Sequence, residues 1–539
     1  MTALAPVVAV GLPTAAVAGI YLTGSRPNVR ELWTFLAAGG ALAAVATMLP
    51  GLLAGETYTA SAGALVSGVA FAFRVDALGG LFALLASFLW LVTSVYSVGY
   101  TRGLELDRQT RYFAAFAASV AATLGVAFAA NLLTLFVFYE LLTVATYPLV
   151  THAGTEEART AGRKYLAYTF GGGIAVLVGT LLVFGTAGTT EFASGGIAGL
   201  TTVDPTLARA AFALLVAGFG VKAALMPVHG WLPDAMVAPT PVSGLLHAVA
   251  VVKSGLFGLA RVVLDVFGPV QVDALGLDAP LAVAASVTIV AASLLALGQD
   301  NLKRRLAYST VSQLSYVVLG LALLHPLAML GGLFHIAAHG FMKLTLFLCA
   351  GALHVETHTK RISEMAGIGR RMPLTMGAFA VAAAGMAGIP VLAGFASKWY
   401  LLVGASAVEG WLFVGVLVLS GVLNVAYFWP VVYTAFFETP DDADPKPLVD
   451  GPLGGRAADS TTASSDDAVV ADGGRDTDDH AGGGFERLPI GREASWFVLG
   501  PVLVAAVGSV LLGVAPDAVF LPLAEAALPA AEPLPGVTG

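Results

Sequence analysis

The sequence predicts an all-α membrane protein with many transmembrane helices. Of its 539 residues, 57% are hydrophobic and only 12% are charged. A soluble domain carries roughly 25% charged residues, so this chain has too few to cover the surfaces of several soluble domains. Apolar stretches of about 20 residues, the length that crosses about 30 Å of hydrocarbon, recur along the whole chain.

Each apolar stretch is expected to be a helix. A segment inside a bilayer must satisfy its backbone hydrogen bonds internally, and the strands of a membrane barrel would be shorter and alternate in polarity. The first stretch follows Met1–Pro6, which contains no basic residue, so we expect a helix and not a cleaved signal peptide. The sequence predicts about fourteen spans, at 3–23, 31–53, 76–98, 112–130, 131–151, 164–186, 207–226, 240–266, 280–298, 305–324, 326–352, 373–396, 410–437 and 495–519.

Basic residues alternate between the two sides of the predicted bundle. They gather in loops that follow odd-numbered helices, and the positive-inside rule places those loops in the cytoplasm. Both termini are then predicted to lie outside a multi-pass protein of the cell membrane. The loop charges in question are Arg26 and Arg30, Arg102, Arg108 and Arg111, Arg159, Arg163 and Lys164, Lys303, Arg304 and Arg305, and Lys360, Arg361, Arg370 and Arg371.

One long segment, residues 438–494, lacks this apolar character. It holds 14 of the 35 acidic residues and 5 of the 27 basic residues, so it accounts for the net charge of −8. Its Gly- and Asp-rich composition predicts a flexible cytoplasmic loop, with a solvated linker as the simplest interpretation. The mildly acidic balance argues against a nucleic-acid partner. The single cysteine, Cys349, excludes an intrachain disulfide and a cysteine-rich cluster, so no metal or cofactor is expected.

Ionisable residues inside the predicted spans are the candidate functional residues, because a charge at the bilayer centre costs roughly 2.5–3.5 kcal/mol. Glu140 lies in the middle of its span, although a protonated carboxyl could simply hydrogen-bond a neighbouring helix. Lys222 lies five residues before Pro227, which predicts a broken helix near the lysine. A lysine that snorkels to the surface is the alternative.

Two further basic residues, His247 and Lys253, share the span at 240–266. Six residues apart on a helix, they lie about 120° from each other and about 9 Å apart along the axis. They need not touch, but water between them would allow a proton relay. A lone buried histidine with a structural role is the alternative for His247.

Three titratable residues lie in file in the span at 326–352. His335, His339 and Lys343 follow an i, i+4, i+8 spacing, which places them along one stripe of a helix with a drift of about 40° per step. Histidine changes protonation near neutral pH, so the stripe predicts a proton wire. Half of a zinc site is the alternative, but the sequence lacks the glutamate of the H-E-x-x-H motif.

Lys398 completes the series. It follows Pro390 and Gly394, which again predict a broken helix. Two interrupted spans with a lysine at each break, in different halves of the chain, indicate an internal structural repeat.

These residues lie in recognisable motifs, and the chain resembles a known family over roughly residues 70–440. The family comprises the antiporter-like membrane subunits shared by Mrp-type multisubunit cation/proton antiporters, respiratory complex I and membrane-bound hydrogenases. The motifs are FYELLT, KAALMPVHGWLPDAMVAPTPVSGLLHA, QDNLKRRLAYSTVSQ, FHIAAHGFMK and GIPVLAGFASK.

The resemblance implies fourteen helices with two inverted five-helix repeats, helices 4–8 and 9–13, in which helices 7 and 12 are broken. The implied divisions are 1–110 (helices 1–3), 111–266 (first repeat), 267–437 (second repeat), 438–494 (acidic loop) and 495–539 (last helix and tail). It also implies a role for each buried residue: Glu140 pairs with Lys222, His247 and Lys253 connect, His335, His339 and Lys343 relay, and Lys398 ends the path.

The implied function is proton translocation in a multisubunit Na⁺/H⁺ antiporter, with other membrane subunits as partners, in contact with the lipid bilayer. The segment RKYLAYTF at 163–170 resembles the Mrp D-type subunit or the middle subunit of complex I, whereas His247 together with Lys253 resembles the large Mrp subunit and the distal subunit of complex I. The length of the chain favours the Mrp D-type subunit. A proton-pumping subunit of complex I or of a membrane-bound hydrogenase is the alternative. No enzymatic activity is expected of the chain in isolation.

Overall fold

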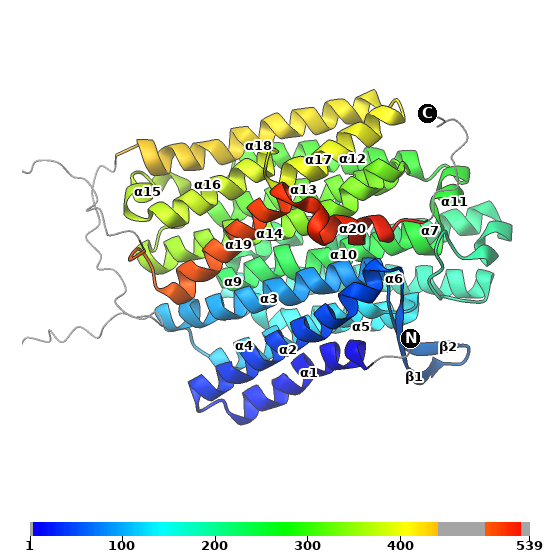
Figure 1. Cartoon of the computed structure of the whole chain (residues 1–539), viewed down its shortest axis with the longest axis horizontal. Coiled ribbons are helices and arrows are strands. Elements are labelled where there is room, and N and C mark those ends of the chain that lie inside the picture. Colours follow the sequence, from blue (N-terminus) through cyan, green and yellow to red (C-terminus); the bar gives the residue numbers. More distant parts are fainter. Residues whose placement is uncertain (1–3, 440–490, 530–539) are drawn as a thin grey trace, which may run out of the picture.

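The long helices run side by side as a bundle, as Figure 1 shows for the computed structural model, which describes residues 4–439 and 491–529. Nearly all of the acidic segment 438–494 lies outside the described residues. The main helices are α1 (Ala5–Leu22), α2 (Pro27–Leu53), α3 (Ala77–Gly103), α4 (Gln109–Phe128), α5 (Leu132–Val150), α6 (Glu156–Ala187), α7 (Pro205–Lys222), α12 (Asp278–Leu297), α13 (Leu302–Ala322), α14 (Pro326–Thr357), α16 (Pro373–Ala387), α17 (Ala393–Ala407), α18 (Trp411–Phe437) and α19 (Trp496–Val514).

The helical membrane fold predicted from the sequence is confirmed. In the described part of the chain, 11 helices are long and apolar enough to cross a membrane, and α16 is a shorter apolar helix. Burial separates inner helices from outer ones. The most apolar window of α14 is 100% buried inside the protein, whereas that of α18 is 28% buried, so α14 is the central helix and α18 presents most of its surface outward.

Two of the predicted spans are broken helices. Helix α7 ends at Lys222, and after a turn the chain forms the short helix α8 (Trp231–Asp234). The second break separates α16 from α17, with residues 388–392 between them. Both breaks fall near the glycine and proline residues that predicted them, although the second half of this interrupted span continues to Ala407 and not to 396.

The predicted span at 240–266 is helical throughout but irregular. It consists of α9 (Thr240–Gly244), a π-helical turn (Leu245–Val249), α10 (Val251–Arg261) and a second π-helical turn (Val262–Val266). A π turn inserts one residue into the helical repeat and rotates the rest of the helix. The rotation that we expected between His247 and Lys253, calculated for a regular α-helix, therefore does not apply.

A β-hairpin between α2 and α3 was not predicted. Strands β1 (Tyr58–Val66) and β2 (Val69–Val75) pair antiparallel and lie at one end of the bundle, beside the start of α1 and the end of α2 (Figure 1). The alternation of large and small residues in VAFAFRV is the sequence signal for β2. This signal is weak, because the strands are short and lie between two apolar runs of transmembrane length.

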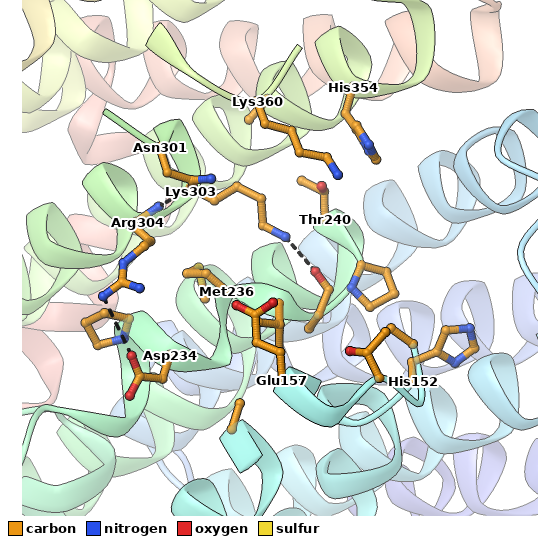
Figure 2. Close-up of a pocket in the computed structure, with 18 of the residues that line it drawn as sticks. His152, Glu157, Asp234, Met236, Thr240, Asn301, Lys303, Arg304, His354 and Lys360 are labelled. Carbon is orange, nitrogen blue, oxygen red and sulfur yellow. Dashed lines mark hydrogen bonds and ion pairs between the residues drawn. The ribbon is translucent and has the colours of Figure 1, made fainter. Parts of the chain in front are cut away.

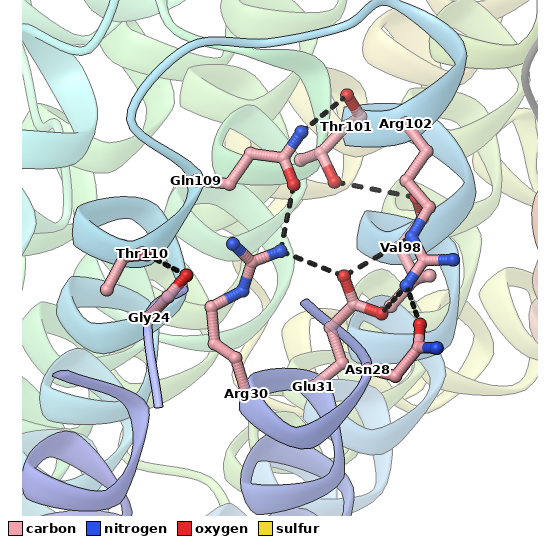
Figure 3. A network of polar contacts seen from close by, with 9 residues as sticks. All are labelled: Gly24, Asn28, Arg30, Glu31, Val98, Thr101, Arg102, Gln109 and Thr110. Atoms are coloured by element: carbon pink, nitrogen blue, oxygen red, sulfur yellow. Dashed lines mark hydrogen bonds and ion pairs between the residues drawn. The ribbon is translucent and has the colours of Figure 1, made fainter. Parts of the chain in front are cut away.

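At the opposite end of the bundle, a polar network joins the first helices to α4 (Figure 3). Arg30 donates hydrogen bonds to Glu31 at 2.9 Å and to Gln109 at 2.8 Å. Arg102, at the end of α3, forms an ion pair with Glu31, whose side chain is 4% exposed. The network therefore ties the beginning of α2 to the α3–α4 connection.

A second buried cluster lies near the hairpin, around Arg261. This guanidinium donates to Asp76 and to Asp265, each at 2.7 Å, and its side chain is only 1% exposed. Asp76 also caps the first turn of α3 by accepting from the backbone N–H of Gly79 at 2.9 Å. The two carboxylates neutralise the buried cation and fix α10 against the start of α3.

Replacing Arg261 with alanine should destabilise the protein strongly, because it leaves Asp265 without its ion-pair partner and leaves Asp76 only the more distant Arg74, at 3.7 Å. Breaking a buried ion pair from one side typically costs about 3 kcal/mol or more. Thermal unfolding in detergent, followed by intrinsic fluorescence, should show a clearly lower Tm. The matched control is Arg163→Ala, which removes an exposed ion pair with Glu156 and should change the stability by about 0.5 kcal/mol or less.

Candidate proton-transfer site

The candidate residues on α14 lie at the centre of the bundle. His335, His339 and Lys343 are all 0% exposed, and the rings of the two histidines lie 6.0 Å apart between centroids. The spacing along α14 therefore produces the buried stripe that the sequence predicted. Each member of the stripe contacts a different neighbouring helix, so α14 joins elements from both halves of the chain.

His339 contacts Lys253 of α10. The Nζ atom of Lys253 lies 2.8 Å from Nδ1 of His339, and both side chains are fully buried. A protonated lysine has only donors, so in that state His339 accepts through Nδ1; when the lysine is neutral, the imidazole donates. The contact can therefore hold one proton and pass it in either direction.

His335 contacts the broken helix instead. Its Nδ1 lies 2.8 Å from Oγ of Ser397, and this hydroxyl donates to the carbonyl of Gly394 at 3.2 Å. With its own proton directed to that carbonyl, Ser397 accepts from His335. The next residue, Lys398, donates to the carbonyl of Met386 on α16, so the histidine stripe reaches the residue beside the lysine at the break.

Lys343 contacts a different helix, α13. Its Nζ donates to Oγ of Ser309 at 2.6 Å and to the carbonyl of Leu306 at 3.2 Å, both on α13. The drift of about 40° per step places Lys343 about 80° from His335 around α14, which explains the different neighbour. The structure therefore brings His339 and His335 together with Lys253 and Ser397, but places Lys343 on a branch.

Glu140 and Lys222 form no ion pair within the described chain. Lys222 is 0% exposed; its Nζ donates to the carbonyl of Tyr139 and lies 3.3 Å from the centroid of that ring. Glu140 follows Tyr139 on α5 and is partly buried, and its Oε1 atom is buried without a hydrogen-bond partner in the described residues. Glu140 and Lys222 are thus not in direct ion-pair contact in this structure, and the lysine binds Tyr139 instead.

His247 lies in the first π-helical turn. It is 0% exposed, its ring packs 4.8 Å from that of Phe347, and neither ring nitrogen has a partner among the described residues. The hydrogen bond of Lys253 goes to His339 and not to His247. His247 is therefore near the path but is not joined to it by a direct hydrogen bond.

A cavity of about 700 Å³ opens at the end of the bundle that the basic loops predict to be cytoplasmic (Figure 2). Its wall includes Asp234, which pairs with Lys164 at 2.6 Å and with Arg304 at 3.7 Å. Lys303 donates to the carbonyl of Ala238 at 2.5 Å across the same space. The cavity is therefore lined by paired and solvent-facing charges from the connections of several helices.

The wall of the cavity also includes Tyr100, Thr240 and His354. The Oη atom of Tyr100 accepts from the backbone N–H of Thr240 at 3.2 Å and lies 3.5 Å from Nδ1 of His354. Thr240 begins the segment that carries His247.

Another residue of the cavity wall is His152. Burial and the nearby charge of Arg111 lower the pKa of His152 below its usual range, so this histidine is neutral at pH 7.

The sequence predicted eight ionisable candidates but not the neutral groups that contact them, and it did not single out the buried Arg261 and Asp265. Ser309 and Tyr139 lie in predicted apolar spans, and Tyr100 lies just after one. Their side chains are uncharged, so nothing in the sequence marked them as functional residues. Ser397 lies beside the predicted break and was not proposed as a site residue. Within the described residues, no group of three or more histidine, cysteine or acidic side chains is placed to hold a metal ion.

Comparison with known proteins places this arrangement in context. Residues 129–424 match the family model described as NADH:quinone oxidoreductase/Mrp antiporter, TM. A relative from Desulforudis audaxviator named NADH-quinone oxidoreductase subunit N is 34% identical over 68% of this chain and 72% of the relative. A Rhizobium meliloti protein, named as a probable subunit of a K(+)/H(+) antiporter, is 35% identical over 61% of this chain but only 32% of its own length.

The fold is shared over almost the whole chain with a solved structure, that of the Mrp complex from Dietzia sp. DQ12-45-1b. The TM-score is 0.80, and the alignment covers 97% of this chain and 96% of the other at 24% identity. At that identity, the likeness shows the fold alone.

Replacing Ser397 with alanine should slow proton transfer about tenfold, because His335 loses its hydrogen-bond partner on the helix that carries Lys398. That factor corresponds to about 1.4 kcal/mol, the size of one well-formed hydrogen bond. The measurement is the rate of proton movement into everted membrane vesicles that contain the whole assembly. Ser406→Ala is the control, because Ser406 lies on the same helix and donates only to the carbonyl of Leu402. Equal rates in both variants would remove Ser397 from the path.

Proposed function

Because the chain belongs to the NADH:quinone oxidoreductase/Mrp antiporter transmembrane family, we propose that it translocates protons in a multisubunit Na⁺/H⁺ antiporter. At the coarser level, it is a proton-translocating, antiporter-like membrane subunit of the Mrp or complex I type. Other membrane subunits of the same assembly are its proposed partners. The proposed location is the cell membrane, with both termini outside.

The observation that carries the proposal is the row of buried polar side chains from Lys253 to Ser397, the residue before Lys398. Nε2 of each histidine has no hydrogen-bond partner in the described residues, so the two rings are neighbours without a hydrogen bond between them. Lys253 contacts His339, His339 lies beside His335 on α14, and His335 contacts Ser397. These groups form a line across the bundle and do not surround a substrate cavity. A line of exchangeable protons favours a relay over alternating access to a bound solute.

Lys222 and Glu140 are proposed to drive this relay. At about 7 Å and an effective dielectric constant near 20, a lysine and a carboxylate attract each other by roughly 2.4 kcal/mol. Closing the pair would hold a proton on Lys222, and separating it would release that proton toward Lys253. The proton would continue through His339 and His335 to Lys398, with Lys343 and His247 as side positions that can store a proton.

The antiporter assignment rests on the sequence. The segment at 163–170 resembles the D-type Mrp subunit and the middle subunit of complex I, and we propose the first of these. The Rhizobium relative is also named as an antiporter subunit, with potassium as the exchanged cation. We propose sodium as the exchanged cation and include potassium in the test.

Complex I is the second candidate assembly. The Desulforudis relative, named as a subunit of an NADH-quinone oxidoreductase, matches over 72% of its own length. A subunit of that assembly would pump protons by the same buried series, with the driving reaction in other subunits. The two candidates therefore differ in partners and in the source of energy.

Purification of the complex from native membranes through a tag on this chain distinguishes the two assemblies. The antiporter proposal predicts partners without flavin or iron–sulfur absorption, together with sodium-dependent collapse of a pH gradient in everted vesicles. Potassium in place of sodium tests the cation. Flavin and iron–sulfur spectra together with NADH-driven acidification would assign the chain to complex I instead.

Glu140→Ala and Lys222→Ala should each abolish cation-coupled proton movement while leaving the complex assembled, because each removes one charge of the proposed driving pair. Proton movement is measured in everted vesicles by a pH-sensitive dye, and assembly by co-purification of the partner subunits. Glu409→Ala, at an exposed loop position, is the control and should retain the full rate. Full transport in both pair variants would contradict the proposed mechanism.

A further inference from the structure

Three consecutive glycines in α6, Gly171 to Gly173, face three different surroundings. A Cβ atom added to Gly171 would have nothing within 4 Å. One added to Gly172 would lie 2.9 Å from Cβ of Val221 on α7. One added to Gly173 would lie 2.2 Å from Oε1 of Glu140 and 2.6 Å from its Cδ.

The third glycine therefore leaves the space that the Glu140 carboxyl group occupies. A contact of 2.2 Å is far below any van der Waals distance, so alanine at this position would exclude the carboxyl as it stands. Glycine in a helix costs about 1 kcal/mol relative to alanine, and α6 carries this cost at three neighbouring positions. The absence of a side chain at Gly173 thus makes room for the carboxyl group of Glu140, a member of the proposed driving pair.

The contact also explains where Glu140 points. Its Oε1 atom is buried against α6 without a hydrogen-bond partner in the described chain, while the ammonium group of Lys222 is bound to the carbonyl of Tyr139. The carboxyl lies in the space beside Gly173 while Lys222 is held elsewhere. This is the separated arrangement of the pair.

We propose that Gly173 is a positioning residue that admits the Glu140 carboxyl group to α6 and so allows the Glu140–Lys222 pair to separate. This inference rests on the proposed function, because the pair must separate for the lysine to release its proton. With the space filled, the carboxyl turns toward Lys222 and the ion pair persists. Gly172 has a different role, since its missing side chain allows α6 and α7 to pack closely.

The test is Gly173→Ala in the whole complex, with Gly171→Ala as the matched control in the same run of glycines. Gly173→Ala should lower the rate of cation-driven proton movement about tenfold. It should also shift the pH profile toward alkaline pH by about one unit, because a closer carboxylate holds the lysine proton more tightly. Gly171→Ala should leave both the rate and the profile unchanged.

Shortening the acid separates positioning from general packing. Glu140→Asp withdraws the carboxyl by one methylene, about 1.5 Å, so adding Gly173→Ala to Glu140→Asp should change the rate less than about twofold. If Gly173→Ala prevents assembly and the double variant assembles, the clash is again with the Glu140 carboxyl. Equal damage by Gly173→Ala in both backgrounds would overturn the inference in favour of packing.

An infrared measurement provides a readout that does not depend on transport. The carboxyl band of Glu140, identified by its loss in Glu140→Gln, should shift in Gly173→Ala and not in Gly171→Ala. An unshifted band in both, or a wild-type rate and pH profile in Gly173→Ala, would overturn the role of Gly173. The proposed function fails separately, if Glu140→Ala itself transports at the full rate.

Discussion

The cost of placing a charge inside hydrocarbon is the constraint on which the rest of the structure depends. The molecule meets it in two ways, according to whether the charge can be lost. Arg261, which cannot release its proton, binds two carboxylates. Within the described chain, the four buried lysines of the proposed path have neutral partners: carbonyl, hydroxyl or imidazole groups and, for three of them, an aromatic ring. A neutral partner forms a hydrogen bond with a lysine but does not stabilise its charge as a carboxylate would. These lysines can therefore release and regain a proton.

Helix α14 provides the rigid axis along which such exchange can run. Its fully buried stripe contacts α10 through His339 and the broken helix α16–α17 through His335. The break also supplies polar groups where a regular helix would have none: Lys398 of α17 donates to the carbonyl of Met386 near the C-terminal end of α16, where unpaired carbonyls gather. The break in the helix therefore provides the carbonyl group that binds the buried lysine.

The sequence was sufficient for the class of fold and pointed to eight ionisable candidates, because an ionisable side chain in an apolar span stands out by its cost. It did not single out Arg261 and Asp265, although both lie in the predicted span at 240–266 and are buried in the structure. It also placed both helix breaks, from Pro227 and Gly394 and their neighbours. It could not supply Ser397, Tyr139 or Gly173, whose roles depend on which helices pack together. The π-helical turns around His247 and the β-hairpin were missed for related reasons: the first leaves no periodic signal, and the second is short and lies between long apolar runs.

The central claim is that Lys253 and His339 act in series on one proton path. The most direct test compares Lys253→Met, His339→Leu and the double variant by the rate of proton movement in everted vesicles carrying the whole complex. Residues in series on one path are blocked by either change, so the account predicts that the double variant loses no more than the more damaging single variant. Losses that multiply in the double variant would show two independent contributions and would contradict a single path through α14.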